Sequence, residues 1–179
     1  IYVRGGGPDQ NLFLLDGVPV YNANHLFGFM SVFNPDAVKS VQLYKGGFPA
    51  RFGERLSSVV DIRMKEGNEK EFSGNVAVGL ISSKFSLEGP IIKDRTSFVI
   101  SGRRTYYDIL ARPFIMRYNQ GKEDKTTGGY YFYDLNTKVN HKFSEKSRLY
   151  LSSYFGRDRA YTRNTYRPNY EGDDDIRME

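Results

Sequence analysis

The stretch from Tyr133 to Phe143 alternates between two kinds of side chain with almost no error. Odd positions carry Tyr, Leu, Thr, Val, His and Phe, and even positions carry Asp, Asn, Lys, Asn and Lys. A period of two predicts a β-strand whose two faces meet different surroundings. In a soluble sheet the apolar face covers a core, whereas in an outer-membrane barrel it meets lipid and the polar face lines a wet lumen. The alternation by itself leaves both structures open.

The two halves of the chain differ in the length of their elements, and the change falls in the charged stretch Lys65–Phe72. Before it, glycine-rich turns separate short segments. A helix is predicted to begin at Asn34, because an asparagine cap followed by Pro35 and Asp36 suits a helix N-terminus. Short strands are predicted at Ile1–Val3, Asn11–Leu15, Val18–Val20, in "VQLYKGG" and in "VVDIRMK", with a tight turn at Asp16-Gly17. The first half therefore predicts a small α+β unit.

After Phe72 the predicted strands are longer. They cover Gly74–Leu87 (with an irregularity near Leu80-Ile81), Ser97–Tyr107, Tyr130–Phe143 and Arg148–Asp158. Their connections run short, long, short and long, and Asp108–Gly129 is predicted as a long polar loop. Short turns at one end and long loops at the other are typical of outer-membrane barrels, although a soluble sandwich also meanders. Aromatic residues at both ends of the Tyr130–Phe143 strand favour the barrel.

Composition removes several function classes. The chain has 26 Lys and Arg against 21 Asp and Glu, and the excess is scattered, so nucleic-acid binding is not expected. With no Cys and only two His, in different halves, neither a disulfide nor a metal site is expected. Gly5-Gly6-Gly7 lacks the Lys and Ser or Thr of a phosphate loop, and no catalytic arrangement follows from spacing. Asp173-Asp174-Asp175 lacks the spacing of an EF-hand. We expect neither an enzyme nor a cofactor.

Two further features concern the membrane and the chain ends. No window approaches the roughly 18–20 consecutive apolar residues of a membrane helix, which leaves a barrel possible. The chain starts without a signal peptide and within a strand-like run, so we expect it to be cut from a longer protein.

Four motifs in the first half carry a resemblance to a known family. They are "VRGG", "LLDGVPV", "FNPDAVKSVQLYKGGFPARFG" and "SSVVDIRMKEG". In this order and spacing they resemble the plug domain of TonB-dependent outer-membrane receptors of the Bacteroidetes type. The chain departs from the SusC-like glycan importers after the predicted helix, where it reads "YKGGFPARFGERL". The second half resembles the first strands of the receptor barrel.

The resemblance implies an architecture and an activity. Residues 1–67 would be a plug domain without its N-terminal part, and residues 68–179 would supply about four antiparallel strands of a transmembrane barrel of about 22. The receptor would import a substrate across the bacterial outer membrane, with the plug gating the lumen. Its partners would be outer-membrane lipid and TonB with ExbB and ExbD, which contact a segment upstream of Ile1. A signal sensor, a receptor partnered by a surface lipoprotein, and a soluble exported β-rich binding module are the alternatives.

The resemblance also implies site residues. Loops at the plug apex meet substrate, and the matching positions here are Asp9, Gln10, Tyr21, Asn22, Asn24 and His25. Small, amide and aromatic side chains suit a polar ligand, but Gly, Asn and Asp also simply make turns. Arg4 and Lys45 match basic plug positions that face carboxylates on the barrel wall, and a solvated strand end is the alternative for both.

Overall fold

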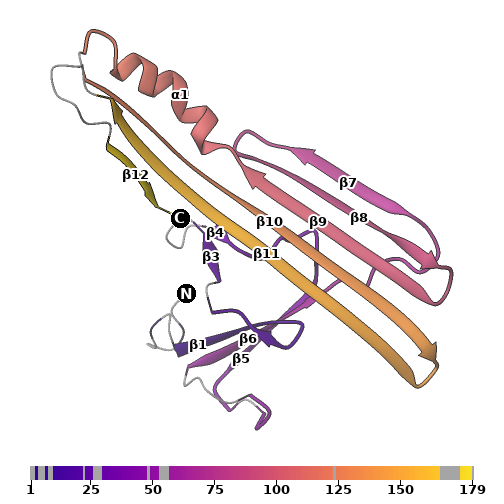
Figure 1. Ribbon diagram of the computed structural model, residues 1–179. Helices are drawn as coiled ribbons and strands as arrows, with labels where there is room; N and C mark the ends of the chain where they lie inside the picture. The colour runs from indigo at the N-terminus through magenta and orange to yellow at the C-terminus, as the bar shows by residue number, and fades with distance from the viewer. Residues whose placement is uncertain are drawn as a thin grey trace.

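The computed structural model describes residues 3, 7, 10–21, 23–25, 30–47, 49–52, 57–122 and 124–165, and the backbone of 174–178. These residues form one helix and twelve strands in three sheets (Figure 1). Residues 10–64 contain a four-stranded and a two-stranded sheet, which we call together the N-terminal unit. Residues 73–178 contain a six-stranded antiparallel sheet, which we call the wall sheet. Figure 1 shows the N-terminal unit lying along one side of the wall sheet.

The N-terminal unit buries apolar side chains on both faces of its four-stranded sheet. Its strands are β1 (Asn11–Leu15), β2 (Val18–Pro19), β5 (Val38–Lys45) and β6 (Ser58–Met64), in the order β2-β1-β6-β5. β1 and β6 are parallel, as expected for strands covered on both faces. The predicted turn between β1 and β2 is present, with positive φ at both of its residues. β3 (Asn24–His25) and β4 (Met30–Ser31) pair as a separate two-residue ladder.

The helix predicted to begin at Asn34 does not form. The Asn34 side chain does accept a hydrogen bond from the Asp36 amide at 3.1 Å, which is the predicted capping contact. Only one turn follows, and from Val38 the chain pairs with β6 along the whole of β5. The local signal was correct, but the ladder with β6 offers every residue of β5 a neighbouring strand. Tertiary pairing therefore overrides the local preference.

The wall sheet has six strands where the sequence predicts about four. They are β7 (Ser73–Val78), β8 (Ser82–Ile92), β9 (Thr96–Thr105), β10 (Lys125–Ser144), β11 (Ser147–Thr165) and β12 (Asp174–Met178). The predicted long strand Gly74–Leu87 divides at residues 79–81 into two paired strands, and β12 adds an edge. β10 and β11 have 20 and 19 residues. At about 3.3 Å per residue they are about 65 Å long, roughly twice the thickness of a bilayer core.

The loop predicted at Asp108–Gly129 contains a helix, α1 (Tyr107–Tyr118). The sequence lacks the usual signals of this helix. Pro113 lies inside it, and Tyr106, at its N-cap position, makes no capping hydrogen bond. Side-chain bonds of Asn119 to the backbone of Thr126 tie its end to β10, at 2.7 and 3.1 Å. The short β8–β9 and β10–β11 turns lie at the opposite end of the wall sheet (Figure 1). Among the described residues, no helix is both long and apolar enough to span a membrane.

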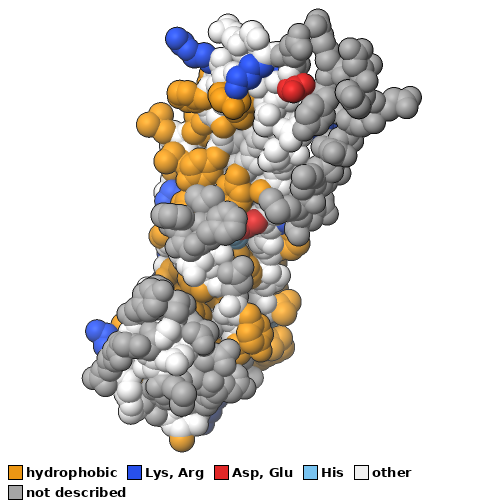
Figure 2. Space-filling view, turned by 90° about the vertical axis from the view of Figure 1, so that its left-hand side faces the viewer, with side chains coloured by type: hydrophobic (Ala, Val, Ile, Leu, Met, Phe, Trp, Pro, Cys, Tyr) orange, Lys and Arg blue, Asp and Glu red, His pale blue; other side chains and the backbone are white. Residues whose placement is uncertain are grey.

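Burial on the wall sheet is inverted relative to a soluble protein. On β10, Asp134, Asn136, Lys138 and Asn140 are at most 6% exposed, beneath the N-terminal unit. The alternate positions point away from it, and Phe143 is 65% exposed. The same outward face carries Val76, Val78, Phe85, Leu87, Leu149, Leu151 and Phe155, all exposed. Figure 2 shows hydrophobic side chains open to the surroundings over part of one face of the molecule. An apolar exterior around a polar interior is the arrangement of a membrane-barrel wall.

Gly67, between the two units, offers a test of how closely they are joined. Its φ is +82°, and an added Cβ would lie 2.4 Å from the Phe98 carbonyl oxygen on β9. Gly67→Ala should lower the free energy of unfolding by about 1–2 kcal/mol for the backbone conformation and by about 1–3 kcal/mol more for the clash. The measurement is the denaturant midpoint of the full-length protein in detergent. Gly121→Ala is the matched control, because Gly121 has φ +75° and open space around it. Equal losses in the two variants would contradict a close junction at Gly67.

Candidate functional site

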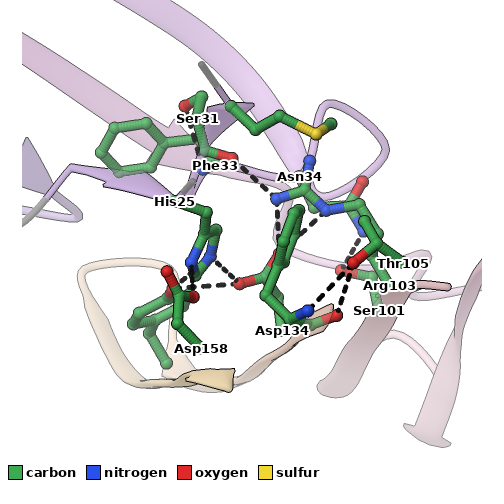
Figure 3. Close-up of polar contacts among 12 residues, drawn as sticks. His25, Ser31, Phe33, Asn34, Ser101, Arg103, Thr105, Asp134 and Asp158 are labelled. Carbon is green, nitrogen blue, oxygen red and sulfur yellow. Dashed lines mark hydrogen bonds and ion pairs between the residues drawn. The ribbon is translucent and has the colours of Figure 1, made fainter. Parts of the chain in front are cut away.

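The N-terminal unit contacts the wall sheet through buried charged side chains, and the largest group centres on His25. His25 lies in β3 and is 4% exposed. Its Nε2 is 2.5 Å from Asp134 Oδ1 on β10, and its Nδ1 contacts Asp158 Oδ1 on β11. The imidazole stacks on the ring of Phe132 with 4.2 Å between centroids. One residue of the N-terminal unit thus bridges carboxylates on two neighbouring wall strands, as Figure 3 shows.

The second oxygen of Asp134 is held by Arg103 of β9. Arg103 Nε donates to Asp134 Oδ2 at 2.8 Å, and its Nη2 forms an ion pair with the same oxygen. That Nη2 also donates to the Ser31 carbonyl oxygen of β4 at 2.7 Å. The Tyr154 hydroxyl donates to Asp134 Oδ1 at 3.1 Å. We define the His25 cluster as His25, Ser31, Arg103, Asp134, Tyr154 and Asp158. Its buried charges are paired across the two units, which is the condition under which ionised groups tolerate burial.

The His25 cluster favours the protonated imidazole. Burial by itself lowers the pKa of His25, but the hydrogen bond and the charge of Asp134 raise it. The charge and hydrogen bond of Asp158 raise it further, so the pKa of His25 lies above its ordinary value of 6.5. In the protonated form both ring nitrogens donate, one to each carboxylate. His25 and Arg103 then balance the charges of the two aspartates.

A second group centres on Asp16, at the turn between β1 and β2. Asp16 Oδ1 accepts a hydrogen bond from the Met64 amide at 3.0 Å and pairs with Lys138 Nζ at 3.1 Å. Its Oδ2 accepts from the Ser152 hydroxyl at 2.6 Å. Lys138 also donates to the Met64 carbonyl oxygen at 3.4 Å. The group borders a pocket of about 310 Å³ whose lining includes Asp16, Lys39, Arg63, Glu66, Lys138 and Tyr150.

Two further contacts lie between these groups along the interface. Lys84 of β8 pairs with Asp36 at 2.9 Å, and the Asn34 amide donates to the Ser101 hydroxyl of β9 at 3.4 Å. The N-terminal unit is therefore attached to β8, β9, β10 and β11 by polar contacts. Among the described residues, no group of three or more His, Asp or Glu side chains is placed to hold a metal ion.

Comparison with known proteins identifies the N-terminal part. Residues 1–60 match the family model of the TonB-dependent receptor plug domain. This part of the chain is therefore similar to the plug domain of TonB-dependent receptors. No curated protein matches the chain. Among solved structures, it is similar to the siderophore receptor PirA from Pseudomonas aeruginosa, with 22% identity and a TM-score of 0.60. The alignment covers 91% of this chain and 29% of the receptor.

The fold and location follow from these findings. The chain has the fold of a plug domain followed by antiparallel barrel strands, and it belongs to the outer membrane. The chain spans 29% of the length of the receptor it matches. The assignment to the Bacteroidetes type stays a prediction.

The structure separates the residues predicted to meet substrate. Gln10 is exposed, Tyr21 is 86% exposed and Asn24 is half-buried. His25, in contrast, is buried against the wall and bonded to it, so in this conformation it attaches the plug rather than facing an open cavity. Asp9 and Asn22 lie outside the described residues. The substrate role of these positions stays a prediction.

Lys45 is absent from the described plug–wall ion pairs, and the roles expected for Arg4 and Lys45 stay predictions. Lys45 is exposed at the end of β5 and makes no ion pair with another described residue, and Arg4 lies outside the described residues. At two of the observed contacts the plug supplies acids, Asp16 and Asp36, and the wall supplies lysines. At the His25 cluster the plug supplies the basic group and the wall supplies the carboxylates. Sequence reasoning missed these plug acids. A usable signal was the charge on the even positions of the 133–143 strand, since charges on the inner face of a barrel strand need partners.

Asp134 should be the most costly single residue of the interface to remove. Asp134→Ala leaves His25 and Arg103 buried without their shared partner, which we expect to cost about 3–5 kcal/mol of plug attachment. The measurement is the denaturant midpoint of plug release, reported by a fluorophore on a Tyr21→Cys variant of the full-length receptor. Glu88→Ala is the control, because Glu88 is also on the inner face but accepts a hydrogen bond from Ser73 of the neighbouring strand and, among the described residues, contacts no group of the plug. A loss in Asp134→Ala no larger than in the control would contradict the network.

The raised pKa of His25 predicts that plug attachment weakens with rising pH. A group whose folded pKa is raised contributes stability that is complete below its unfolded pKa, about 6.5, and is lost as pH rises through the folded pKa. The midpoint of plug release should therefore fall as pH is raised from about 6.5 through that higher value. His25→Gln should have a lower midpoint at acidic pH and should lack this fall. Parallel pH profiles for the two proteins would show that another group is responsible.

Proposed function

We propose that this chain, within a longer receptor, takes part in energy-coupled import of a substrate across the outer membrane. The plug domain gates the lumen in this proposal. The observation that carries it is the interface itself: the plug closes the polar face of the wall through buried ion pairs rather than through an apolar core. A gate must hold firmly and yet separate without exposing a hydrophobic surface, and a polar interface meets both requirements.

Buried ion pairs suit a gate that opens under force. Their attraction offsets desolvation only while the geometry is good, so a displacement that separates His25 from its carboxylates removes most of the attachment. Water then enters and solvates the separated charges. TonB with ExbB and ExbD would supply the pull, through a segment outside this chain. Substrate can shift the balance between the attached and the displaced plug only if it binds these two states with different affinity.

The proposed substrate contacts are the apex loops. Gln10, Tyr21 and Asn24 offer exposed or half-buried amide and phenol groups, and Asp9 and Asn22 are their neighbours in sequence. His25 follows directly, so a ligand that moves Asn24 pulls on the His25 cluster through one peptide unit. Because the similar solved structure is a siderophore receptor, ferric siderophores are the first substrate class to test.

The division of the chain supports the same proposal. We propose residues 1–67 as plug and 68–179 as barrel wall, since β6 ends at Met64 and β7 begins at Ser73. The exposed apolar face of the wall argues against a soluble exported module. A sensor role or a lipoprotein partner would use the same plug and wall, and no contact among the described residues favours either one.

A disulfide between plug and wall tests gating directly. These 179 residues contain no Cys, so an introduced pair will not mispair within them. Asn34→Cys with Ser101→Cys replaces a contact of 3.4 Å between plug and β9. The oxidised double variant should lose uptake of radioactive iron supplied as a ferric siderophore, and a reductant should restore it. Binding of the siderophore should persist in both states.

The control disulfide joins two wall strands. Thr137→Cys with Ser153→Cys links paired residues of β10 and β11, and it should leave uptake unchanged. Each single Cys variant checks folding. The proposed gating would be contradicted if the oxidised plug–wall variant took up iron at the same rate as the control. No binding by the unmodified receptor across a siderophore panel would remove that substrate class but not the gate.

A further inference from the structure

Asp158 is the carboxylate of the His25 cluster that is open to solvent. Its side chain is 39% exposed, whereas the side chain of Asp134 has no exposed surface. Asp158 lies opposite Phe132, which is two residues further along β10 towards α1 than Asp134. The long connections at the α1 end mark the extracellular side of the wall sheet. The exposed carboxylate of the cluster is therefore the one nearest to the side from which a substrate would arrive.

The partners of Asp158 differ from those of Asp134. Asp134 is bonded by two cationic side chains, His25 and Arg103. Asp158 uses Oδ1 for the contact with His25, and its Oδ2 accepts a hydrogen bond from the neutral Tyr130 hydroxyl at 2.9 Å. The imidazole of His25 lies between the two carboxylates (Figure 3). Because a carboxylate has about four positions that accept hydrogen bonds, the exposed Asp158 can accept more of them.

Aromatic rings border the exposed carboxylate. Besides Tyr130, whose hydroxyl is bonded to Asp158, there is Tyr107 at the start of α1, with 6.3 Å between the centres of the two tyrosine rings. The Tyr107 hydroxyl contacts the sulfur of Met30 in β4 at 3.6 Å, so this ring reaches over the inner side of the wall. A carboxylate pairs with an ammonium or guanidinium group, and aromatic rings attract such a cation within about 6 Å. These groups together suit an organic cation.

Attachment of the plug decides how much negative charge Asp158 presents. In the attached state the charges of His25 and Arg103 balance those of Asp134 and Asp158. When the plug moves away, Arg103 still pairs with Asp134 because both belong to the wall, but Asp158 loses His25. The wall then carries one negative charge that the plug no longer balances. A cation is therefore attracted more strongly in the displaced state, and this difference in affinity is what a ligand needs to shift the balance.

We propose that Asp158 binds an ammonium or guanidinium group of the substrate and that this group competes with His25. The inference rests on the proposed gating by the plug, and it adds the kind of ligand group to which the gate responds. A cation on Asp158 Oδ2 lies close to the imidazolium of His25, and like charges at such a distance repel each other. Binding therefore weakens the attachment of the plug, and loss of attachment strengthens binding by the same factor.

Binding of a small organic cation to the full-length receptor in detergent tests this site. The probe is n-butylammonium, followed by saturation-transfer NMR of its butyl protons at constant chloride concentration. Asp158→Asn should weaken binding at least about tenfold, and Asp158→Glu should restore most of it. Asp124→Asn is the matched control, because it removes the same charge from the exposed loop before β10, at the same end of the wall. n-Butanol, which lacks the charge, should not displace the probe.

The reciprocal effect separates a coupled site from an ordinary surface charge. His25→Gln removes the competing cation, so it should raise the affinity for n-butylammonium about five- to tenfold. The midpoint of plug release should fall when n-butylammonium replaces an equal concentration of sodium chloride, and Asp158→Asn should lack this fall.

Three results would each overturn the proposal: no binding to the unmodified receptor, equal loss in Asp124→Asn, or unchanged or weaker binding in His25→Gln. None of these arms measures uptake. Their failure is therefore distinguishable from a failure of the disulfide test of import.

Discussion

The burial of Asp134 is the constraint on which the rest of the structure depends. Its side chain has no exposed surface, and its two oxygens are divided between His25 and Tyr154 on one side and Arg103 on the other. An ionised carboxylate is stable there only because it is paired on both sides. Arg103 extends the same network to Ser31. The position of the β3–β4 ladder and the polar face of β9 and β10 are thereby linked through one residue.

This constraint explains why the two parts of the chain need each other. β3 and β4 have two residues each and could not persist as an isolated ladder. They lie against the wall because His25 and the Ser31 carbonyl oxygen find their partners there. The wall in turn carries Lys138 on its inner face, and the Asp16 turn of the plug supplies the carboxylate for it. Each part supplies the partners that the buried charges of the other part need.

The two faces of the wall sheet also differ in chemistry. The inner face carries charge pairs, such as Asp134 with His25 and Arg103, that contact the N-terminal unit. The outer face carries exposed apolar side chains, such as Leu135 and Phe155, as a wall facing lipid does. Both faces come from the same strands because successive side chains point to opposite sides. Asp134 and Leu135 are neighbours in sequence, and yet one lies under the N-terminal unit and the other faces outwards.

The sequence by itself determined the main strands of the wall at Ser97–Tyr107, Tyr130–Phe143 and Arg148–Asp158, their two-sided character and the plug motifs, because these depend on local alternation and turn chemistry. The β1–β2 turn at Asp16-Gly17 and the strand Asn11–Leu15 were correct for the same reason. Only the tertiary structure decided which face of β10 was buried and that the Asn34 turn would end in a strand. It also turned His25 towards the wall, since its partner Asp134 lies 109 residues away. Pairings over such distances depend on the whole chain's packing, and no local pattern encodes them.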